Sequence, residues 1–251
     1  MILKDFFSDN PSAALAFSGG VDSAYLLYAA LQYGAKVKAY YVKSVFQPEF
    51  ELTDARRLTK ELSADMTVIQ KDILSDTRIA SNPADRCYHC KKTIFETIKQ
   101  QAMADGFTLL IDGTNASDSY DDRPGMKALE ELSVMSPLRE CGITKAEIRR
   151  LSEEAGLFTW NKPAYACLAT RIPTGMLITE ELLQKIDAAE NLLFGMGFTG
   201  FRVRVTDGTA KLQVSAEQMK LVIKQREQIL HELKPYFPAV FLDLAERQET
   251  V

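Results

Sequence analysis

Short apolar runs alternate with longer helix-like segments over the first two thirds of the chain. The runs with the character of buried strands are residues 13–17, 37–42, 66–69 and 108–111. The segments with helical character are residues 24–31, 51–63 and 91–104, and a further helix that opens at the capping box of Thr144 and Glu147 and runs to Gly156. Strands separated by helices are typical of a parallel sheet with crossovers on both faces. The pattern therefore predicts an α/β fold for this part of the chain.

The pattern changes beyond residues 161–175, a stretch with two prolines and a glycine that we interpret as a loop or linker. A helix is predicted over residues 179–194. Apolar residues and arginines then alternate in the order Phe201, Arg202, Val203, Arg204 and Val205. This two-residue period predicts a strand with both arginines on one face. Asp207-Gly208 predicts a hairpin turn, with strands over residues 211–214 and 240–244. We therefore predict two domains, an α/β domain at 1–172 and a smaller C-terminal α+β domain at 173–251.

Composition narrows the classes of function. The chain has 251 residues, of which 46% are hydrophobic and 25% are charged, and its 30 basic and 34 acidic residues give a formal charge of −4. This balance argues against a broad basic surface for nucleic acid or anionic lipid. No apolar run approaches the roughly 18 residues of a membrane span, and residues 1–11 lack the features of a signal peptide. We therefore expect a cytoplasmic protein that acts on small molecules, without a membrane partner or a nucleic-acid ligand.

The hexapeptide Ser18-Gly19-Gly20-Val21-Asp22-Ser23 lies between the first predicted strand and the first predicted helix. Paired glycines allow backbone N–H groups to turn toward an anion, and the helix that follows adds the positive end of its dipole. A Walker A loop needs a longer span with a lysine, and a dinucleotide fingerprint needs another glycine spacing. The hexapeptide therefore predicts a phosphate-binding loop of a different type, and the alternative is an ordinary glycine turn.

The hexapeptide resembles the SGGxDS motif of the PP-loop ATP pyrophosphatases, which have a Rossmann-like parallel sheet. The resemblance implies that ATP is cleaved between its α- and β-phosphates, leaving an adenylated substrate and pyrophosphate. It implies a catalytic, magnesium-binding role for Asp22 and ATP contacts by Ser18, Gly19, Gly20, Ser23, Ser44, Gly113 and Asn115. The last two end a predicted strand, and open α/β sheets bind ligands at the carboxyl ends of strands. Asp118, Asp121 and Asp122 follow closely, where the alternative is a solvated acidic loop.

The four cysteines are a second source of candidate chemistry, because disulfides are rare in the cytosol. Cys87 and Cys90 have C-x-x-C spacing among cationic residues, which favour thiolates. Cys167 lies in the predicted linker, and Cys141 is interpreted as an ordinary buried residue. A C-x-x-C pair is compatible with structural zinc, with a redox dithiol, with incidental cysteines, or with two ligands of an iron–sulfur cluster.

Several further segments together resemble the LarE sulfur transferases over nearly the whole chain. They are residues 82–92, 112–115, 123–125, 136–138, 162–173 and 201–204. In that family, ATP adenylates a carboxylate of pyridinium-3,5-dicarboxylic acid mononucleotide and sulfur replaces oxygen, which leads to the nickel-pincer nucleotide cofactor of lactate racemase. One branch uses a single cysteine, at the position of Cys167, as a sacrificial sulfur donor. Another branch has three cysteines that carry a [4Fe-4S] cluster.

The three-cysteine pattern of this chain implies the cluster type, with Cys87, Cys90 and Cys167 as the iron ligands. The resemblance also implies that Arg202 and Arg204 bind the phosphate of the substrate. It further implies a homo-oligomer, for which a hexamer is one candidate state, and it leaves the source of sulfide open. Glu190 is a weaker candidate for a metal or substrate contact.

Three other functions stay open on the sequence alone. A tRNA thiolase shares the PP-loop but needs an RNA-binding surface, which the acidic balance disfavours. An ammonia-dependent amide synthase explains the loop and leaves the cysteines without a role. A nucleotide-sensing module would bind ATP without turnover.

Overall fold

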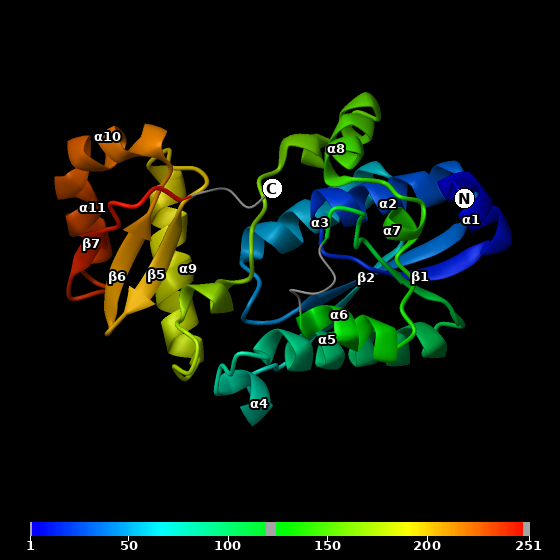
Figure 1. Ribbon diagram of the computed structural model, residues 1–251, viewed down its shortest axis with the longest axis horizontal. Coiled ribbons are helices and arrows are strands. Elements are labelled where there is room, and N and C mark those ends of the chain that lie inside the picture. The colour runs from blue at the N-terminus through cyan, green and yellow to red at the C-terminus, as the bar shows by residue number, and fades with distance from the viewer. Residues whose placement is uncertain (1, 119–123, 248–251) are drawn as a thin grey trace. The chain divides into compact units, whose positions relative to one another are not determined.

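The computed structural model describes residues 2–118 and 124–247, and its contacts divide the chain into two units (Figure 1). The N-terminal unit comprises Met1–Ile73 and Asp85–Lys162, and the C-terminal unit comprises Leu74–Ala84 and Pro163–Val251. The N-terminal unit contains α1 (Leu3–Asp9), β1 (Ser12–Ala16), α2 (Val21–Gln32), β2 (Lys36–Lys43), α3 (Glu49–Glu61), β3 (Met66–Gln70), α5 (Arg86–Ala104), β4 (Leu110–Asp112), α6 (Pro124–Glu131), α7 (Pro137–Glu140), α8 (Lys145–Glu154) and the 3-10 helix η1 (Phe158–Asn161). The C-terminal unit contains α4 (Thr77–Ala80), the 3-10 helix η2 (Leu168–Arg171), α9 (Glu180–Gly195), β5 (Arg202–Thr206), β6 (Thr209–Gln213), α10 (Ala216–Lys224), α11 (Arg226–Leu233) and β7 (Val240–Leu242).

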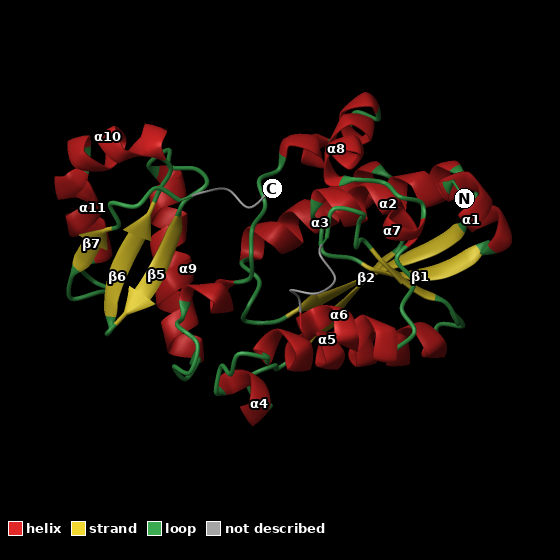
Figure 2. Cartoon of the chain, in the orientation of Figure 1, coloured by secondary structure: helices red, strands yellow, loops and turns green. Residues whose placement is uncertain are grey.

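The core of the N-terminal unit is a parallel sheet in the order β3-β2-β1-β4. Helices cover both faces of this sheet, with α2 and α3 on one side and α5 and α6 on the other (Figure 2). Neighbouring residues of a strand pack on opposite faces, because Leu15 belongs to the cluster with α2 and α3 whereas Ala14 belongs to the cluster with α5 and α6. The predicted α/β fold with a parallel sheet is confirmed.

The C-terminal unit is built on a three-stranded sheet in the order β5-β6-β7. The predicted hairpin joins β5 and β6, with Asp207 and Gly208 at φ angles of 48° and 74°. Because β7 pairs with β6 in parallel, the chain crosses over through α10 and α11 before it returns to the sheet. The smaller α+β arrangement predicted from the sequence is therefore present.

The contact division differs from the predicted boundary between residues 172 and 173. Residues 163–172 and the distant segment Leu74–Ala84 both belong to the C-terminal unit. The amide of Asn82 donates to the carbonyl groups of Ile172 and Pro173, at 3.3 and 2.7 Å. The backbone N–H of Gly175 donates to the carbonyl of Asn82 at 2.8 Å. These bonds fasten the segment to residues that are about ninety positions away, and local sequence patterns do not report such contacts.

Helix α5 begins earlier than the prediction, at Arg86 instead of residue 91. The carbonyl of Asp85 accepts hydrogen bonds from the N–H groups of Tyr88 and His89, which opens the first turn. The carboxylate of Asp85 also lies 3.3 Å from His89 Nε2. The C-x-x-C pair is consequently helical. Among the described residues, no helix is long and apolar enough to cross a membrane.

Candidate functional site

The predicted phosphate-binding loop joins the end of β1 to the start of α2. Gly19 has a φ of +72°, and a Cβ atom there would lie 3.2 Å from the Cβ of Ala55 on α3, so both conformation and space favour glycine. The hydroxyl oxygens of Ser18 and Ser23 lie 3.0 Å apart, and the N–H of Ser18 donates to the Ser23 hydroxyl at 3.3 Å. Gly20 is the N-cap of α2, which leaves N–H groups of the first turn at the loop.

Asp22 stands in the first turn of α2, directly after the loop. Its Oδ2 lies 2.6 Å from the Nζ of Lys145, and its Oδ1 accepts from the amide of Asn115 at 3.4 Å. Burial raises the pKa of Asp22 above its ordinary value of 3.8, although Lys145 lowers it, and the nearby Asp118 adds to the rise. The site therefore favours additional positive charge at this carboxylate, which suits a divalent cation such as Mg²⁺.

The end of β4 lies against the same loop. A Cβ atom on Gly113 would be 2.8 Å from the backbone nitrogen of Ser23, so the two backbones approach as closely as glycine allows. Asp112 holds this turn, because its carboxylate accepts from the hydroxyls of Thr114 and Ser136, at 2.5 and 2.7 Å. The structure thus brings Gly113 and Asn115 to residues 18–23, as the carboxyl-end argument predicts.

Ser44 is engaged in the turn that follows β2. Its hydroxyl donates to the Oε1 of Gln47 at 2.7 Å and accepts from the N–H of Phe46 at 3.2 Å. An ATP contact of the Ser44 hydroxyl, as the resemblance implies, would therefore compete with hydrogen bonds within this turn. Asp121 and Asp122, together with Arg123 of the family-like segment 123–125, lie outside the described residues.

Lys145 was missed by the sequence reading, although the helix that carries it was predicted. The hydroxyl of Thr144 accepts from the N–H of Glu147 at 3.3 Å, so the predicted N-terminal cap is present. That cap places Lys145 at the first helical position of α8. Its partner Asp22 is 123 positions away, so only the packing of α8 on α2 reveals the pair.

Two of the four free cysteines lie one turn apart in α5. Cys87 is exposed and Cys90 is partly buried, and the guanidinium of Arg86 lies 3.7 Å from the sulfur of Cys87. Cys167 belongs to the C-terminal unit, where it is the N-cap of η2. Within either unit, the described residues hold no group of three or more His, Cys, Asp and Glu side chains arranged for a metal ion. Thiolates are the ligands that iron–sulfur clusters prefer, and three of them could hold three irons of a [4Fe-4S] cluster while the fourth iron has no protein ligand.

Cys141, predicted to be an ordinary buried residue, is partly buried in the structure. It caps the short helix α7 and packs against the cluster that contains α2 and α3. Burial raises the pKa of its thiol, which keeps the sulfur protonated and weakly reactive.

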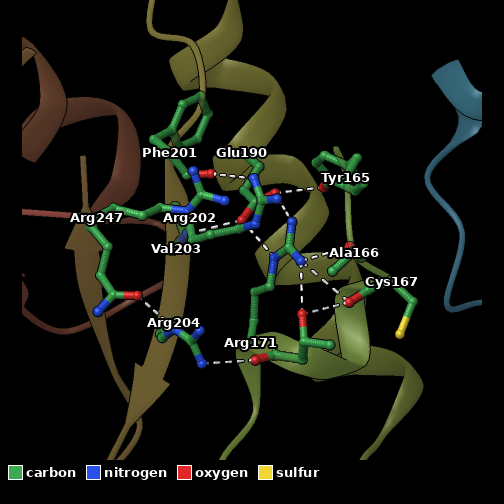
Figure 3. Close-up of polar contacts among 12 residues, drawn as sticks. Tyr165, Ala166, Cys167, Arg171, Glu190, Phe201, Arg202, Val203, Arg204 and Arg247 are labelled. Atoms are coloured by element: carbon green, nitrogen blue, oxygen red, sulfur yellow. Dashed lines mark hydrogen bonds and ion pairs between the residues drawn. The ribbon is translucent and has the colours of Figure 1, made fainter. Parts of the chain in front are cut away.

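Glu190 on α9 is the centre of a buried polar network in the C-terminal unit (Figure 3). Only 1% of its side chain is exposed, and its two oxygens accept from the Nε and Nη2 of Arg171, both at 2.9 Å. The hydroxyl of Tyr165 and the N–H of Val203 also donate to it, at 2.5 and 2.9 Å. These four bonds satisfy the carboxylate with protein groups, so its place is structural in this conformation.

Arg171 connects this network to Cys167. Its Nη1 donates to the carbonyls of Ala166 and Cys167, at 2.7 and 3.2 Å (Figure 3). Burial lowers the pKa of Arg171, but the hydrogen bonds and charge of Glu190 outweigh this effect and raise it. The guanidinium therefore stays charged and fixes the backbone at the cysteine. No role was assigned to Arg171 from the sequence, although it lies within residues 162–173, one of the segments that resemble the LarE family.

Arg202 and Arg204 leave β5 on one face, as predicted, but they differ in burial. Arg202 is 7% exposed, donates to the carbonyl of Ala164 at 2.9 Å and lies 5.0 Å from the ring centre of Tyr165. Arg204 is exposed and donates to the Oε1 of Gln213 at 2.6 Å. Burial, followed by the charges of Arg171 and Arg247, lowers the pKa of Arg202 to about 10, and the same causes lower that of Arg204.

This concentration of guanidinium groups favours an anionic ligand. Four arginines contribute charge to one region of the C-terminal unit, and Glu190 is a carboxylate within their network. An anion placed there would offset the repulsion among the arginines, which adds to the effect of burial in lowering the two pKa values. Arg247 could not be assigned to this region from the sequence, because it follows the last strand by several residues.

The fold and the loop together define the class of protein. A parallel sheet with an SGGxDS loop after its first strand, and a carboxylate at the first turn of the following helix, is the arrangement of the PP-loop ATP pyrophosphatase type. The tRNA-specific 2-thiouridylase MnmA of Thermotoga maritima is 26% identical over 190 residues, which cover 59% of this chain and 53% of that enzyme. No family model matches the chain.

Two longer matches narrow the class to a family. The chain is 31% identical over 239 residues to the pyridinium-3,5-bisthiocarboxylic acid mononucleotide synthase of Lactiplantibacillus plantarum, with 94% of this chain and 87% of that enzyme covered. It is 36% identical over 225 residues to an uncharacterized protein of Synechocystis, with 88% and 83% covered. The chain therefore belongs to the LarE family, that of the pyridinium-3,5-bisthiocarboxylic acid mononucleotide synthase.

Proposed function

We propose that this protein is an ATP-dependent sulfur transferase that converts a carboxylate of pyridinium-3,5-dicarboxylic acid mononucleotide into a thiocarboxylate. The observation that carries the proposal is the partly buried carboxylate of Asp22, held 2.6 Å from Lys145 at the SGGxDS loop, in a chain of the LarE family. A carboxylate oxygen of the substrate attacks the α-phosphorus of ATP, and pyrophosphate leaves. Sulfide sulfur then attacks the acyl carbon, and AMP leaves with the oxygen.

The protein groups at the loop suit the first step. The N–H groups of Gly19, Gly20 and the start of α2, with the hydroxyls of Ser18 and Ser23, would hold the pyrophosphate part of ATP. Asp22 would hold Mg²⁺, which would offset the charge that develops on the phosphates. Asn115, an expected ATP contact, donates to the Oδ1 of Asp22 at 3.4 Å. In the absence of the metal, Lys145 supplies the positive charge at Asp22.

The arginines of β5 suit the phosphate of the mononucleotide. Guanidinium groups bind phosphate oxygens in pairs, and an anion beside Arg202 and Arg204 would raise their lowered pKa values. We therefore assign Arg202 and Arg204 as the substrate phosphate site, in line with the sequence expectation.

For the sulfur, we propose a [4Fe-4S] cluster held by Cys87, Cys90 and Cys167. When bound, such a cluster offers an open iron for sulfide. The alternative is that Cys167 gives up its own sulfur, so that its Cβ–Sγ bond breaks and dehydroalanine remains. In both cases the hydrogen bonds from Arg171 to the Ala166 and Cys167 carbonyls hold the cysteine backbone in place.

Anaerobic purification with iron and sulfide analysis, followed by turnover counting, tests the proposal. We expect about four irons per chain in the wild type and in the matched control Cys141→Ala, and loss of iron in Cys87→Ala. We also expect AMP, pyrophosphate and thiocarboxylate in equal amounts, at more than one turnover per chain. Dehydroalanine at position 167 after a single turnover would contradict the cluster and support Cys167 as the sacrificial sulfur donor. ATP hydrolysis without any thiocarboxylate would contradict the function itself.

A tRNA thiolase is the second candidate, favoured by the similarity to the Thermotoga 2-thiouridylases. The formal charge of −4 disfavours it, because RNA binding depends on basic surface. Titration of the protein with tRNA at several salt concentrations decides between them. We expect no binding at physiological salt.

A further inference from the structure

A second lysine lies at the phosphate-binding loop, and the proposed function does not use it. The Nζ of Lys162 is 3.5 Å from the carbonyl oxygen of Gly19 and 2.7 Å from the Oδ2 of Asp54 on α3. It also lies 5.7 Å from the ring centre of Phe50. Its side chain is 14% exposed, so the ammonium group is held close to the protein. All of these residues belong to the N-terminal unit.

The backbone of Lys162 is fixed by neighbouring elements. The guanidinium of Arg149 on α8 donates to the carbonyl of Trp160 at 2.7 Å and to that of Lys162 at 3.0 Å. The N–H of Lys162 donates to the carbonyl of Thr159 at 3.0 Å. Helix α8, which supplies Arg149, also supplies Lys145 at Asp22. The position of the ammonium group is therefore set by the same elements that build the loop.

The chemistry of the loop leaves a role for such a cation. The β- and γ-phosphates of ATP carry most of its negative charge, whereas the loop itself offers neutral N–H and hydroxyl donors. The hexapeptide lacks the lysine with which a Walker A loop contacts the terminal phosphates. Lys145 is paired with Asp22 at 2.6 Å. The contacts of Lys162 with Asp54 and Gly19 engage two of its three N–H groups, so one more acceptor can be bound.

We propose that Lys162 is a phosphate-binding residue of this loop, whose ammonium group binds a β- or γ-phosphate oxygen of ATP. The proposal rests on ATP being the ligand of the loop, as the proposed function requires. Lys162 would thus do what the lysine of a Walker A loop does, although it is 143 positions away from Gly19 in the sequence. A purely structural role, in which Lys162 only ties residues 160–162 to α3, is the competing explanation.

Ligand affinities separate the two explanations. Loss of a purely structural contact should weaken ligands with and without β- and γ-phosphates alike, whereas loss of a phosphate contact should weaken only those that carry these phosphates. The affinities of the whole protein for Mg–ATP, Mg–pyrophosphate and AMP are measured by calorimetry in the wild type and in Lys162→Met. We expect ATP and pyrophosphate to bind about 10- to 100-fold more weakly, as for loss of a hydrogen bond to a charged group, and AMP to change less than about twofold. Lys162→Arg, which keeps the charge, should recover part of the loss.

Lys38→Met is the matched control. Lys38 forms an ion pair of the same kind in the same unit, 2.6 Å from Asp105, at the beginning of β2 and away from the carboxyl ends of the strands. Its removal should lower the unfolding temperature without changing the affinity for ATP or pyrophosphate. If Lys162→Met does not fold, the same comparison is made with Lys162→Arg, for which ATP and pyrophosphate must weaken more than AMP.

The outcomes distinguish this inference from the proposed function. Equal affinities of wild type and Lys162→Met for pyrophosphate, or a parallel loss of AMP binding, would overturn the role of Lys162. A wild type that binds ATP through Lys162 but forms no thiocarboxylate would overturn the proposed function alone. A wild type that binds no ATP would overturn both.

Discussion

At the scale of single residues, Asp22 is the charged side chain of the loop whose pKa the surroundings change. Its pKa lies above the ordinary value of 3.8, because burial outweighs the effects of Lys145. A native state with a raised carboxyl pKa binds a proton more tightly than the unfolded state does. The stability that this adds is complete below pH 3.8 and is lost as the pH rises through the native pKa. At neutral pH the ionised carboxylate of Asp22 therefore lowers the stability of the folded state.

Replacement of Asp22 by asparagine tests this cost. We expect Asp22→Asn without ligand to be at least as stable as the wild type at pH 7, with a flatter dependence on pH above 4, in urea unfolding. Thermal stabilisation by Mg–ATP should be lost. Asp105→Asn is the control, because the pKa of Asp105 is shifted in the opposite direction: Lys38 and Tyr40 hold it below its usual range. That variant should be less stable at pH 7. A marked fall in the stability of Asp22→Asn would contradict the cost.

The sequence predicted the residues of the loop but not the charges around it. Ser18, Gly19, Gly20 and Asp22 lie within one hexapeptide, so their geometry follows from a local turn before a helix. Lys145 and Lys162 act on the same loop from far along the chain. No local pattern distinguishes such lysines from the solvated lysines of other helices.

At the scale of secondary structure, α9 and η2 are joined by the buried pair of Arg171 and Glu190. Each of these side chains is 1% exposed, which makes the pair inaccessible to water. Loss of one partner leaves the other charge buried without compensation, which costs far more than loss of a surface pair. The pair also orients the carbonyls of Ala166 and Cys167. The stability of these elements and the placement of Cys167 therefore depend on the same contact.

Glu190→Gln should lower the free energy of unfolding by about 3–5 kcal/mol, because Arg171 stays buried beside a neutral group. Glu181→Gln in the same helix is the matched control. Its partner Lys185 is one turn away at 2.7 Å, and 78% of the Glu181 side chain is exposed. Urea unfolding should show no resolvable change for this control. Similar stabilities of both variants would contradict a structural role for the buried pair.

Most elements were predictable because their patterns are local. The alternation from Phe201 to Val205, the hairpin at Asp207-Gly208 and the cap at Thr144 each involve a few neighbouring residues. The start of α5 was predicted too late, since polar residues at its first turn conceal the helix. The same turn carries Cys87 and Cys90, so the spacing of the thiols along one helix face emerged only from the structure.

At the scale of the whole molecule, the residues that we propose to bind ATP and those that we propose to bind the mononucleotide phosphate belong to different units. The loop residues and Asp22 belong to the N-terminal unit, whereas Arg202 and Arg204 belong to the C-terminal unit. Each unit has its own sheet. The phosphates of ATP and of the mononucleotide should therefore be bound by residues of different units.

Hydrogen exchange of the full chain tests this separation. Mg–ATP should slow exchange of the amides in the first turn of α2 and around Gly113. Nicotinic acid mononucleotide, a pyridinium mononucleotide used as a probe, should slow exchange in β5 and around Thr170, whose carbonyl accepts from Arg204 at 3.1 Å. Arg202→Ala is the control that removes only the second effect. Protection of β5 by Mg–ATP alone, with no effect of the mononucleotide, would contradict the assignment.

The sequence by itself determined the order of the elements, the parallel α/β fold and the glycine loop between β1 and α2. These follow from hydrophobic periodicity and from turn residues, which act over a few positions. The tertiary structure alone decided that Lys145 and Lys162 lie at the loop. It also decided that Asn82 fastens Leu74–Ala84 to the C-terminal unit and that Glu190 forms a buried ion pair with Arg171. Contacts of this kind arise from the packing of elements that are distant in sequence, and packing is decided by the whole core.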